Sequence, residues 1–166
     1  MIVLSIDTTL EACQAAVLDG DRVLASASEP MQRGHQERLA PIVAEVMTAA
    51  GVEFTALGRV GVTVGPGSFT GVRVGLAFAK GLGLALGIPC VGVGALDALA
   101  ATAGSSAVGG KLAAAIDARR GQVYLQLFER GRPATEPEAA DLNDAASRIQ
   151  AFFAGEEIRL IGTGAH

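Results

Sequence analysis

An acidic side chain and three hydroxyl side chains cluster near the start of the chain. The segment is Ser5-Ile6-Asp7-Thr8-Thr9, and the apolar, β-branched run from Met1 to Ile6 predicts a buried strand that ends there. Hydroxyls and backbone amides at a strand end can bind phosphate, while a carboxylate reaches the water shell of Mg²⁺. The same residues also suit a local turn in which Asp7 accepts hydrogen bonds from nearby amides. These residues alone leave both interpretations open.

A related segment, Ile116-Asp117-Ala118-Arg119-Arg120-Gly121, follows a second apolar run. A phosphate loop favours glycine directly after the acid, because the backbone must approach the phosphate closely. Ala118 and Arg119 stand there instead, which argues against a working nucleotide clamp. We therefore interpret the two segments as vestigial phosphate loops formed by Asp7, Thr8, Thr9 and Asp117. No cofactor is predicted, although weak nucleotide binding remains open.

Other catalytic arrangements lack the residues they need. The two histidines, His35 and His166, lie far from Ser68 in sequence, and Ser68 does not stand in a G-x-S-x-G nucleophile elbow. Cys13 and Cys90 are far apart and are interpreted as buried free thiols in a reducing compartment. The sequence therefore predicts no catalytic residue and no metal site.

Composition narrows the possible partners. The 166 residues are 50% apolar and carry a formal net charge of -4, with a pI of about 5.1. An acidic chain is a poor stand-alone nucleic-acid binder, so direct tRNA binding through Arg119 and Arg120 is a disfavoured alternative. The start of the chain has no signal-peptide pattern, and no run of about 20 apolar residues is present. We expect a cytoplasmic protein without a membrane segment.

The elements that must position these residues follow from hydrophobic periodicity. A first unit at 1–103 is expected to contain three strands, a helix, a strand, a helix, a strand and a helix. A Gly/Ser/Ala-rich linker at 103–110 leads to a second unit at 104–166 that begins the same pattern and stops early. The expected strands are 1–6, 12–18, 22–28, 60–64, 90–93, 112–116, 122–128 and 158–161.

The first two helices carry the most distinctive patterns. The first has an apolar stripe that includes Leu39, Ile42, Val43 and Val46, and it should stop at Gly51. The second follows the turn Gly65-Pro66-Gly67-Ser68, in which Ser68 is a suitable N-cap. Small residues then recur every four positions along that helix, and each interior glycine costs about 1 kcal/mol relative to alanine. Such a stripe indicates a close backbone neighbour, either the protein's own sheet and first helix or a partner helix.

Four segments of the chain together resemble the TsaB family, formerly YeaZ. They are Ile6 to Glu11, His35 to Pro41, the GPGSFTGVRVG segment Gly65 to Gly75, and Ala115 to Tyr124. The resemblance implies an α/β, actin/hexokinase-like (ribonuclease H-like) fold with mixed sheets and two lobes, of which the second is incomplete here. It also implies a role in forming N6-threonylcarbamoyladenosine beside the anticodon of tRNA.

In that family TsaB is the partner and not the catalyst. The resemblance implies pairing with the paralogue TsaD, docking of the ATPase TsaE on the pair, and only indirect contact with tRNA. TsaD carries a metal-binding His-x-x-x-His after the fifth strand, and Ala95 and Leu99 occupy those positions in this chain. Neither side chain can ligate a metal. Family members usually continue well beyond Gly164, so we expect the chain to be a truncated or short form.

These observations favour a non-catalytic scaffold that pairs with TsaD through its first two helices and forms a homodimer in the absence of TsaD. The alternative is an ATP-binding phosphotransferase or ATPase of the sugar-kinase type that uses Asp7 and Asp117. We expect Val46→Asp or Gly75→Leu to abolish pairing while the monomer stays folded. The expected interface or adjoining core comprises Leu39, Ile42, Val43, Val46, Phe69, Val72, Gly75 and Leu76.

Overall fold

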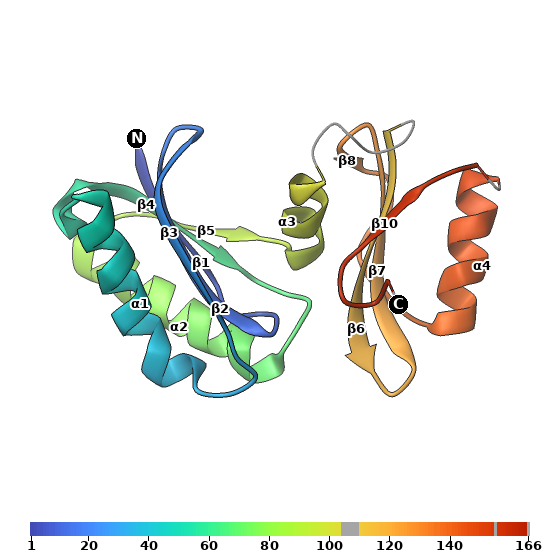
Figure 1. The fold of residues 1–166 in the computed structure, drawn as a ribbon, viewed down its shortest axis with the longest axis horizontal. Helices are drawn as coiled ribbons and strands as arrows, with labels where there is room; N and C mark the ends of the chain where they lie inside the picture. The colour runs from blue at the N-terminus through green and yellow to red at the C-terminus, as the bar shows by residue number, and fades with distance from the viewer. Residues whose placement is uncertain (104–109, 155, 166) are drawn as a thin grey trace. The chain divides into compact units, whose positions relative to one another are not determined.

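A computed structural model describes residues 1–103, 110–154 and 156–165, arranged in two compact units (Figure 1). The first unit is Met1–Val93 and the second is Gly94–His166. The division precedes the boundary expected after residue 103, because helix α3 (Ala95–Thr102) lies against strand β6 (Lys111–Arg119). Most of the predicted linker, 104–109, lies outside the described residues.

The first unit is built on a five-stranded mixed sheet in the order β3-β2-β1-β4-β5. Strands β1 and β2 are antiparallel, as are β2 and β3, whereas β4 runs parallel to both β1 and β5. Every strand and helix predicted for residues 1–103 is present, although the last of these helices, α3, belongs to the second unit. The strands are β1 (Ile2–Asp7), β2 (Ala12–Asp19), β3 (Arg22–Pro30), β4 (Leu57–Thr63) and β5 (Cys90–Val93), and a short 3-10 helix, η1 (Phe54–Ala56), precedes β4.

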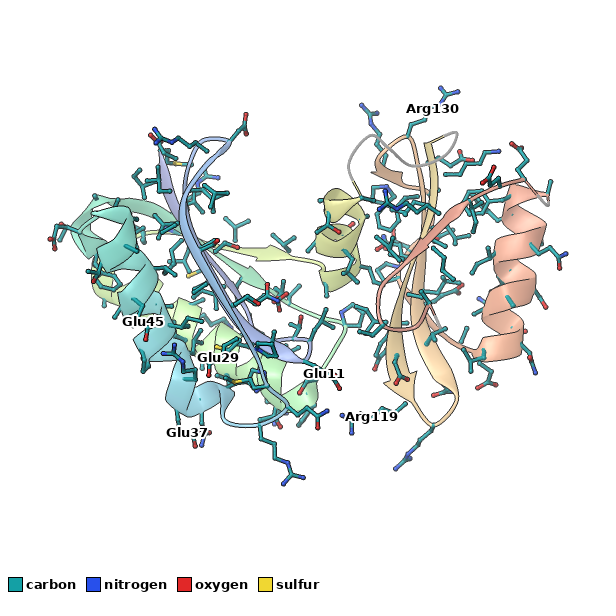
Figure 2. The ribbon with its side chains drawn as sticks, in the orientation of Figure 1. Glu11, Glu29, Glu37, Glu45, Arg119 and Arg130 are labelled. Carbon is teal, nitrogen blue, oxygen red and sulfur yellow. The ribbon has the colours of Figure 1, made fainter. Side chains whose placement is uncertain are left out.

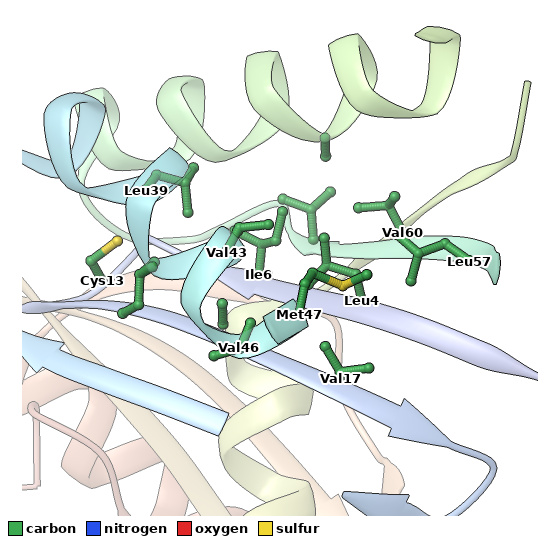
Figure 3. Close-up of a cluster of buried hydrophobic side chains, with 14 residues drawn as sticks. Leu4, Ile6, Cys13, Val17, Leu39, Val43, Val46, Met47, Leu57 and Val60 are labelled. Carbon is green, nitrogen blue, oxygen red and sulfur yellow. The ribbon is translucent and has the colours of Figure 1, made fainter. Parts of the chain in front are cut away.

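Two long helices cover one face of this sheet: α1 (His35–Ala50) and α2 (Phe69–Leu86). Strand β1 alternates between this face and the other, so Leu4 and Ile6 are buried beneath the helices while Ser5 is exposed. Figure 3 shows side chains from α1 and from β1, β2 and β4 gathered into one hydrophobic cluster. This cluster is the core of the first unit.

The ends of both helices follow from the sequence. Ser68 caps α2, because its hydroxyl oxygen accepts a hydrogen bond of 3.2 Å from the backbone N–H of Gly71. Gly51 ends α1 and Gly87 ends α2, each with a positive φ that glycine adopts without steric cost. Ser68 also donates its backbone N–H to the carbonyl oxygen of Thr9, so the N-terminus of α2 lies against the loop after β1.

The second unit holds a sheet in the order β10-β6-β7-β8, with β9 also paired to β7. Strand β10 runs parallel to β6, and β6 and β7 form an antiparallel hairpin. Ala145 and Phe153 of α4 pack against β6 and β7 in a separate core. The remaining elements are β7 (Gln122–Glu129), β8 (Arg132–Pro133), β9 (Glu138–Asp141), α4 (Leu142–Phe153) and β10 (Arg159–Ile161).

Among the described helices, α2 is long and apolar enough to cross a membrane by length and composition, although one such helix is weak evidence for a span. Its glycine-rich side is buried within the first unit. The side that faces solvent carries two cations, Arg73 and Lys80. These features are those of a helix packed on a sheet.

Candidate protein-interaction site

The loop after β1 forms a closed local turn around Asp7. Its Oδ1 atom accepts hydrogen bonds from the Thr9 backbone N–H at 2.8 Å, the Thr9 hydroxyl at 2.6 Å and the Thr63 hydroxyl at 2.7 Å. Three donors saturate one carboxylate oxygen. Of the two interpretations left open by the sequence, the structure contains the local turn.

The hydroxyls beside Asp7 also have partners within the protein. Thr8 and Thr9 are each 1% exposed. The Thr8 hydroxyl donates to the carbonyl oxygen of Gly71 at 2.7 Å, and the Ser68 backbone N–H donates to the carbonyl oxygen of Thr9 at 2.7 Å. The turn before α2 therefore covers the loop after β1 and uses groups that a phosphate would otherwise meet.

The glycines of this turn and helix are required by contact with that loop. A Cβ atom at Gly71 would overlap the carbonyl oxygen of Thr8, and one at Gly67 would overlap the carbonyl oxygen of Thr9. A Cβ at Gly75 would lie 2.7 Å from the Thr8 hydroxyl oxygen. The close backbone neighbour indicated by the small-residue stripe is, at these positions, the protein's own first loop.

Asp117 lies in an exposed turn of the second unit. Its Oδ1 accepts a hydrogen bond of 2.7 Å from the Arg119 backbone N–H, and its own N–H donates to the Thr163 hydroxyl at 3.1 Å. Arg119 lies at the turn of the β6–β7 hairpin (Figure 2), where Arg119 and Arg120 are exposed and have φ values of 66° and 55°. Asp117 is thus also bonded within its own loop.

The residues expected at an interface divide into core and surface. Leu39, Ile42, Val43 and Val46 are each 1% exposed and point from α1 into the core, where Figure 3 labels three of them. Of the two places that the sequence left open for these four residues, a partner surface or the adjoining core, they occupy the core. Gly75 is buried, Val72 and Leu76 are half-buried, and Phe69 is 70% exposed.

The solvent side of α2 carries large apolar side chains. The exposed residues of α2 recur every three or four positions, from Phe69 to Leu84, so they share one face of the helix. That face lies opposite the buried glycines. Leu84 is 86% exposed and Phe69 is 70% exposed, so neither is used in the protein's own core. We call this surface the outer α2 face and define it as Phe69, Arg73, Ala77, Lys80 and Leu84.

An apolar groove of about 490 Å³ borders the outer α2 face. Residues from both α1 and α2 line it. Two of them, Arg73 and Phe69, are stacked: the Arg73 guanidinium lies 3.7 Å from the centre of the Phe69 ring. Large exposed apolar patches on soluble proteins mark interaction sites. The groove residues used below are Gln36, Leu39, Phe69, Arg73, Val74 and Phe78.

Arg38 of α1 is paired with two glutamates, Glu45 of α1 and Glu29 of β3. Arg38 bonds Glu29 at 2.5 Å and Glu45 at 2.7 Å, and Figure 2 labels both glutamates. The hydrogen bond from Arg38 lowers the pKa of Glu45 below its usual range, and the two glutamates raise the pKa of Arg38. No such pairing is present for Arg73 among the described residues.

Among the described residues, the cysteine and histidine side chains, which could bind a metal or undergo redox chemistry, do not line the groove. Cys13 is buried, and burial raises the pKa of its thiol. Cys90 is exposed rather than buried as expected, because β5 is an edge strand, and its thiol lies 2.9 Å from the Ala79 carbonyl oxygen. His35 is buried at the start of α1, and His166 lies outside the described residues. Within the described ranges, no three His, Cys, Asp or Glu side chains are grouped as metal ligands would be.

Comparison with known proteins agrees with this architecture. Residues 23–160 match the family described as TsaD, tRNA N6-adenosine threonylcarbamoyltransferase. The chain is 38% identical over 130 residues to the tRNA threonylcarbamoyladenosine biosynthesis protein TsaB of Escherichia coli. The aligned region covers 78% of this chain and 56% of that protein. The chain spans little more than half the length of the curated relatives it matches.

Solved structures give the same result. YeaZ from Pseudomonas aeruginosa is 35% identical with a TM-score of 0.74, covering 84% of this chain and 66% of that one. A protein described as similar to the peptidase YeaZ from Pseudomonas aeruginosa is 31% identical with a TM-score of 0.80, covering 97% and 82%. Component A of (R)-2-hydroxyglutaryl-CoA dehydratase from Acidaminococcus fermentans shares the fold alone, at 15% identity and a TM-score of 0.52, covering 85% and 48%.

The two mixed sheets with their helices define a protein of the actin/hexokinase-like class, as the sequence predicted. Within that class, the chain belongs to the TsaB/YeaZ family. The sequence did not single out Arg73 and Leu84, because buried and exposed side chains lie within two or three residues of one another along α2. The stripe of glycines was the signal available in the sequence: it requires a close neighbour, so the opposite side of α2 is the one that faces outward.

Proposed function

We propose that the chain acts as a non-catalytic subunit in the formation of threonylcarbamoyladenosine in tRNA and that it pairs with TsaD. Family membership supports the biosynthetic role, and the match to the TsaD family supports a paralogue as the partner. Docking of TsaE, self-association without TsaD, indirect contact with tRNA and a cytoplasmic location belong to the same proposal.

The observation that carries the proposal is the contrast between two surfaces of the first unit. The loop that would bind phosphate is closed on itself, since Asp7, Thr8 and Thr9 bond to their own neighbours. The outer α2 face, by contrast, exposes Phe69 and Leu84 beside an open groove. Such a molecule is better suited to holding a partner than to binding a nucleotide.

The test is complex formation between the purified chain and TsaD of the same organism, followed by light scattering. We expect a complex whose mass is the sum of the two chains. Leu84→Asp should weaken binding at least tenfold, because it places a charge in an apolar contact. Leu142→Asp changes a 49% exposed leucine on α4 of the second unit and is the matched control.

The results separate the proposal from its failure. Binding by the wild type and by Leu142→Asp, with loss in Leu84→Asp, supports pairing through the outer α2 face. Equal binding by all three chains would place the contact elsewhere. If the wild type and TsaD remain separate at micromolar concentrations, pairing itself is wrong.

A phosphotransferase or ATPase of the sugar-kinase type is not favoured. In the described residues, the Asp7 Oδ1 atom and the Thr8 and Thr9 hydroxyls all form hydrogen bonds within the protein. They are therefore not free for a phosphate or a hydrated magnesium ion. Turnover of ATP by the isolated chain would contradict the non-catalytic role.

A further inference from the structure

We infer that the helix which covers the outer α2 face presents a carboxylate to Arg73, so that the partner of this surface is an apolar helix with an acidic side chain at its centre. The inference rests on the proposed pairing and adds the chemistry of the partner. It is carried by the position of Arg73, by the charges of α2 and by the apolar groove beside them.

Arg73 lines the groove and lies over the ring of Phe69. Its guanidinium lies 3.7 Å from the centre of the Phe69 ring, and both residues line the groove with Leu39, Val74 and Phe78. A partner cannot bury Phe69 without also removing water from the guanidinium that lies over it. A charge taken out of water is stabilised only when an opposite charge or several acceptors replace that water.

In the part of the chain that the structure describes, no carboxylate pairs with Arg73. Among the described residues, neither Arg73 nor Lys80 forms an ion pair, and the sequence of α2 contains no aspartate or glutamate. The arginine of α1, Arg38, instead has two glutamates of its own. The acceptor for Arg73 must therefore come from the partner.

A second cation extends the same pattern. Lys80 follows Arg73 by seven residues, which is two turns, so both cations lie on one line along the outer α2 face. Ala77 lies between them and leaves room for a helix to approach closely. The complementary surface is an apolar helix whose central carboxylate faces Arg73, with a second carboxylate about two turns away that faces Lys80.

The test is the affinity of TsaD for a matched set of arginine variants at low and high salt. Arg73→Glu should weaken binding more than tenfold at about 50 mM salt, because a like charge then faces the partner's carboxylate. Arg73→Lys keeps the charge and should retain more of the affinity than Arg73→Glu, although lysine does not reproduce the stacking of the guanidinium on Phe69. Arg132→Glu makes the same change in net charge on the second unit and should leave the affinity unchanged.

Salt gives an independent reading. Wild-type affinity should fall as salt rises from about 50 mM to about 300 mM, since an ion pair at a partly exposed site is screened. Arg73→Gln, which has no charge at this position, should show a weaker dependence on salt. The melting temperature of each variant should match the wild type, because Arg73 is exposed.

Three outcomes decide the matter. Loss of binding in Arg73→Glu, with Arg73→Lys and Arg132→Glu retained, supports the acidic partner helix. If the wild type binds TsaD and Arg73→Glu binds equally well at both salt concentrations, the inference is overturned while the pairing stands. If the wild type does not bind, both the pairing and the inference fail.

Discussion

The hydroxyl of Thr8 donates a hydrogen bond of 2.7 Å to the carbonyl oxygen of Gly71, which joins the loop after β1 to the first turn of α2. In a nucleotide-binding loop, hydroxyls and amides at this place would face a phosphate. Here a helix of the same chain takes that position. The contact stabilises α2, and thereby the surface that α2 presents to solvent.

Replacing Gly71 by alanine should therefore destabilise the first unit. The added methyl group would overlap the carbonyl oxygen of Thr8, so the helix and the loop must separate. We expect a loss of about 1–3 kcal/mol in the free energy of unfolding, measured by urea denaturation. Gly81→Ala is the control: it meets nothing within 4 Å and should stabilise the helix by up to about 1 kcal/mol. Equal effects of the two changes would show that the contact contributes nothing.

Asp7 should serve stability rather than nucleotide binding. Asp7→Ala leaves the hydroxyls of Thr9 and Thr63 without their acceptor, and we expect a cost of about 2–4 kcal/mol in unfolding free energy. Asp7→Asn keeps an oxygen acceptor and should cost less than half of that. Calorimetry with Mg-ATP should detect no binding to either the wild type or Asp7→Asn. Micromolar binding to the wild type that Asp7→Asn abolishes would favour the phosphotransferase alternative.

Much of the first unit could be predicted from periodicity and turn residues. The alternation of Leu4, Ser5 and Ile6 predicts a strand with one buried face, and the glycines at 51 and 87 end the helices where expected. These signals are local, because each depends on residues a few positions apart. The order of such elements predicts a mixed sheet with helices, whereas the actin/hexokinase-like class was implied by the resemblance to the TsaB family.

The direction in which each helix faces could not be predicted, because it depends on contacts distant in sequence. An apolar stripe such as Leu39 to Val46 suits a core and an interface equally well, and only the position of β1 and β2 beneath α1 decides between them. The Thr8–Gly71 contact spans 63 residues and has no local signature. The exposed Leu84 resembles every other leucine of α2 in the sequence.

The burial of Val46 in the core changes what a substitution there measures. Val46 is 1% exposed, so Val46→Asp places a carboxylate in the core and should cost about 3–5 kcal/mol. We expect the first unit to unfold or to melt at a much lower temperature, and any loss of pairing would follow from that. Leu84→Asp, on an 86% exposed side chain, should leave the melting temperature within a few degrees of the wild type. Gly75→Leu is equally unsuitable as an interface probe, because it would displace the Thr8 hydroxyl.

The ion pair between Arg38 and Glu45 should give stability that depends on pH. The hydrogen bond from Arg38 lowers the pKa of Glu45 in the folded state, so folding is favoured while the carboxylate is charged. This contribution is present above the unfolded pKa of about 4.3 and is lost as pH falls through the lower, folded pKa. Glu45→Gln should thus melt slightly below the wild type at pH 7, and the two curves should converge as the pH falls through the lowered pKa of Glu45. Glu53→Gln, which removes an exposed carboxylate without an ion pair in the described residues, is the control.

The β6–β7 turn offers a change that should stabilise the second unit. Arg120 and Gly121 form the two turn residues, and both have positive φ, at 55° and 77°. Two-residue hairpin turns of this kind favour asparagine followed by glycine, because asparagine tolerates the left-handed conformation better than arginine. Arg120→Asn should raise the free energy of unfolding by about 0.5–1 kcal/mol, whereas Arg132→Asn, in strand β8, should not. If tRNA were bound directly through this turn, Arg120→Asn would also weaken a gel shift at low salt; we expect no such loss, because the chain is acidic overall.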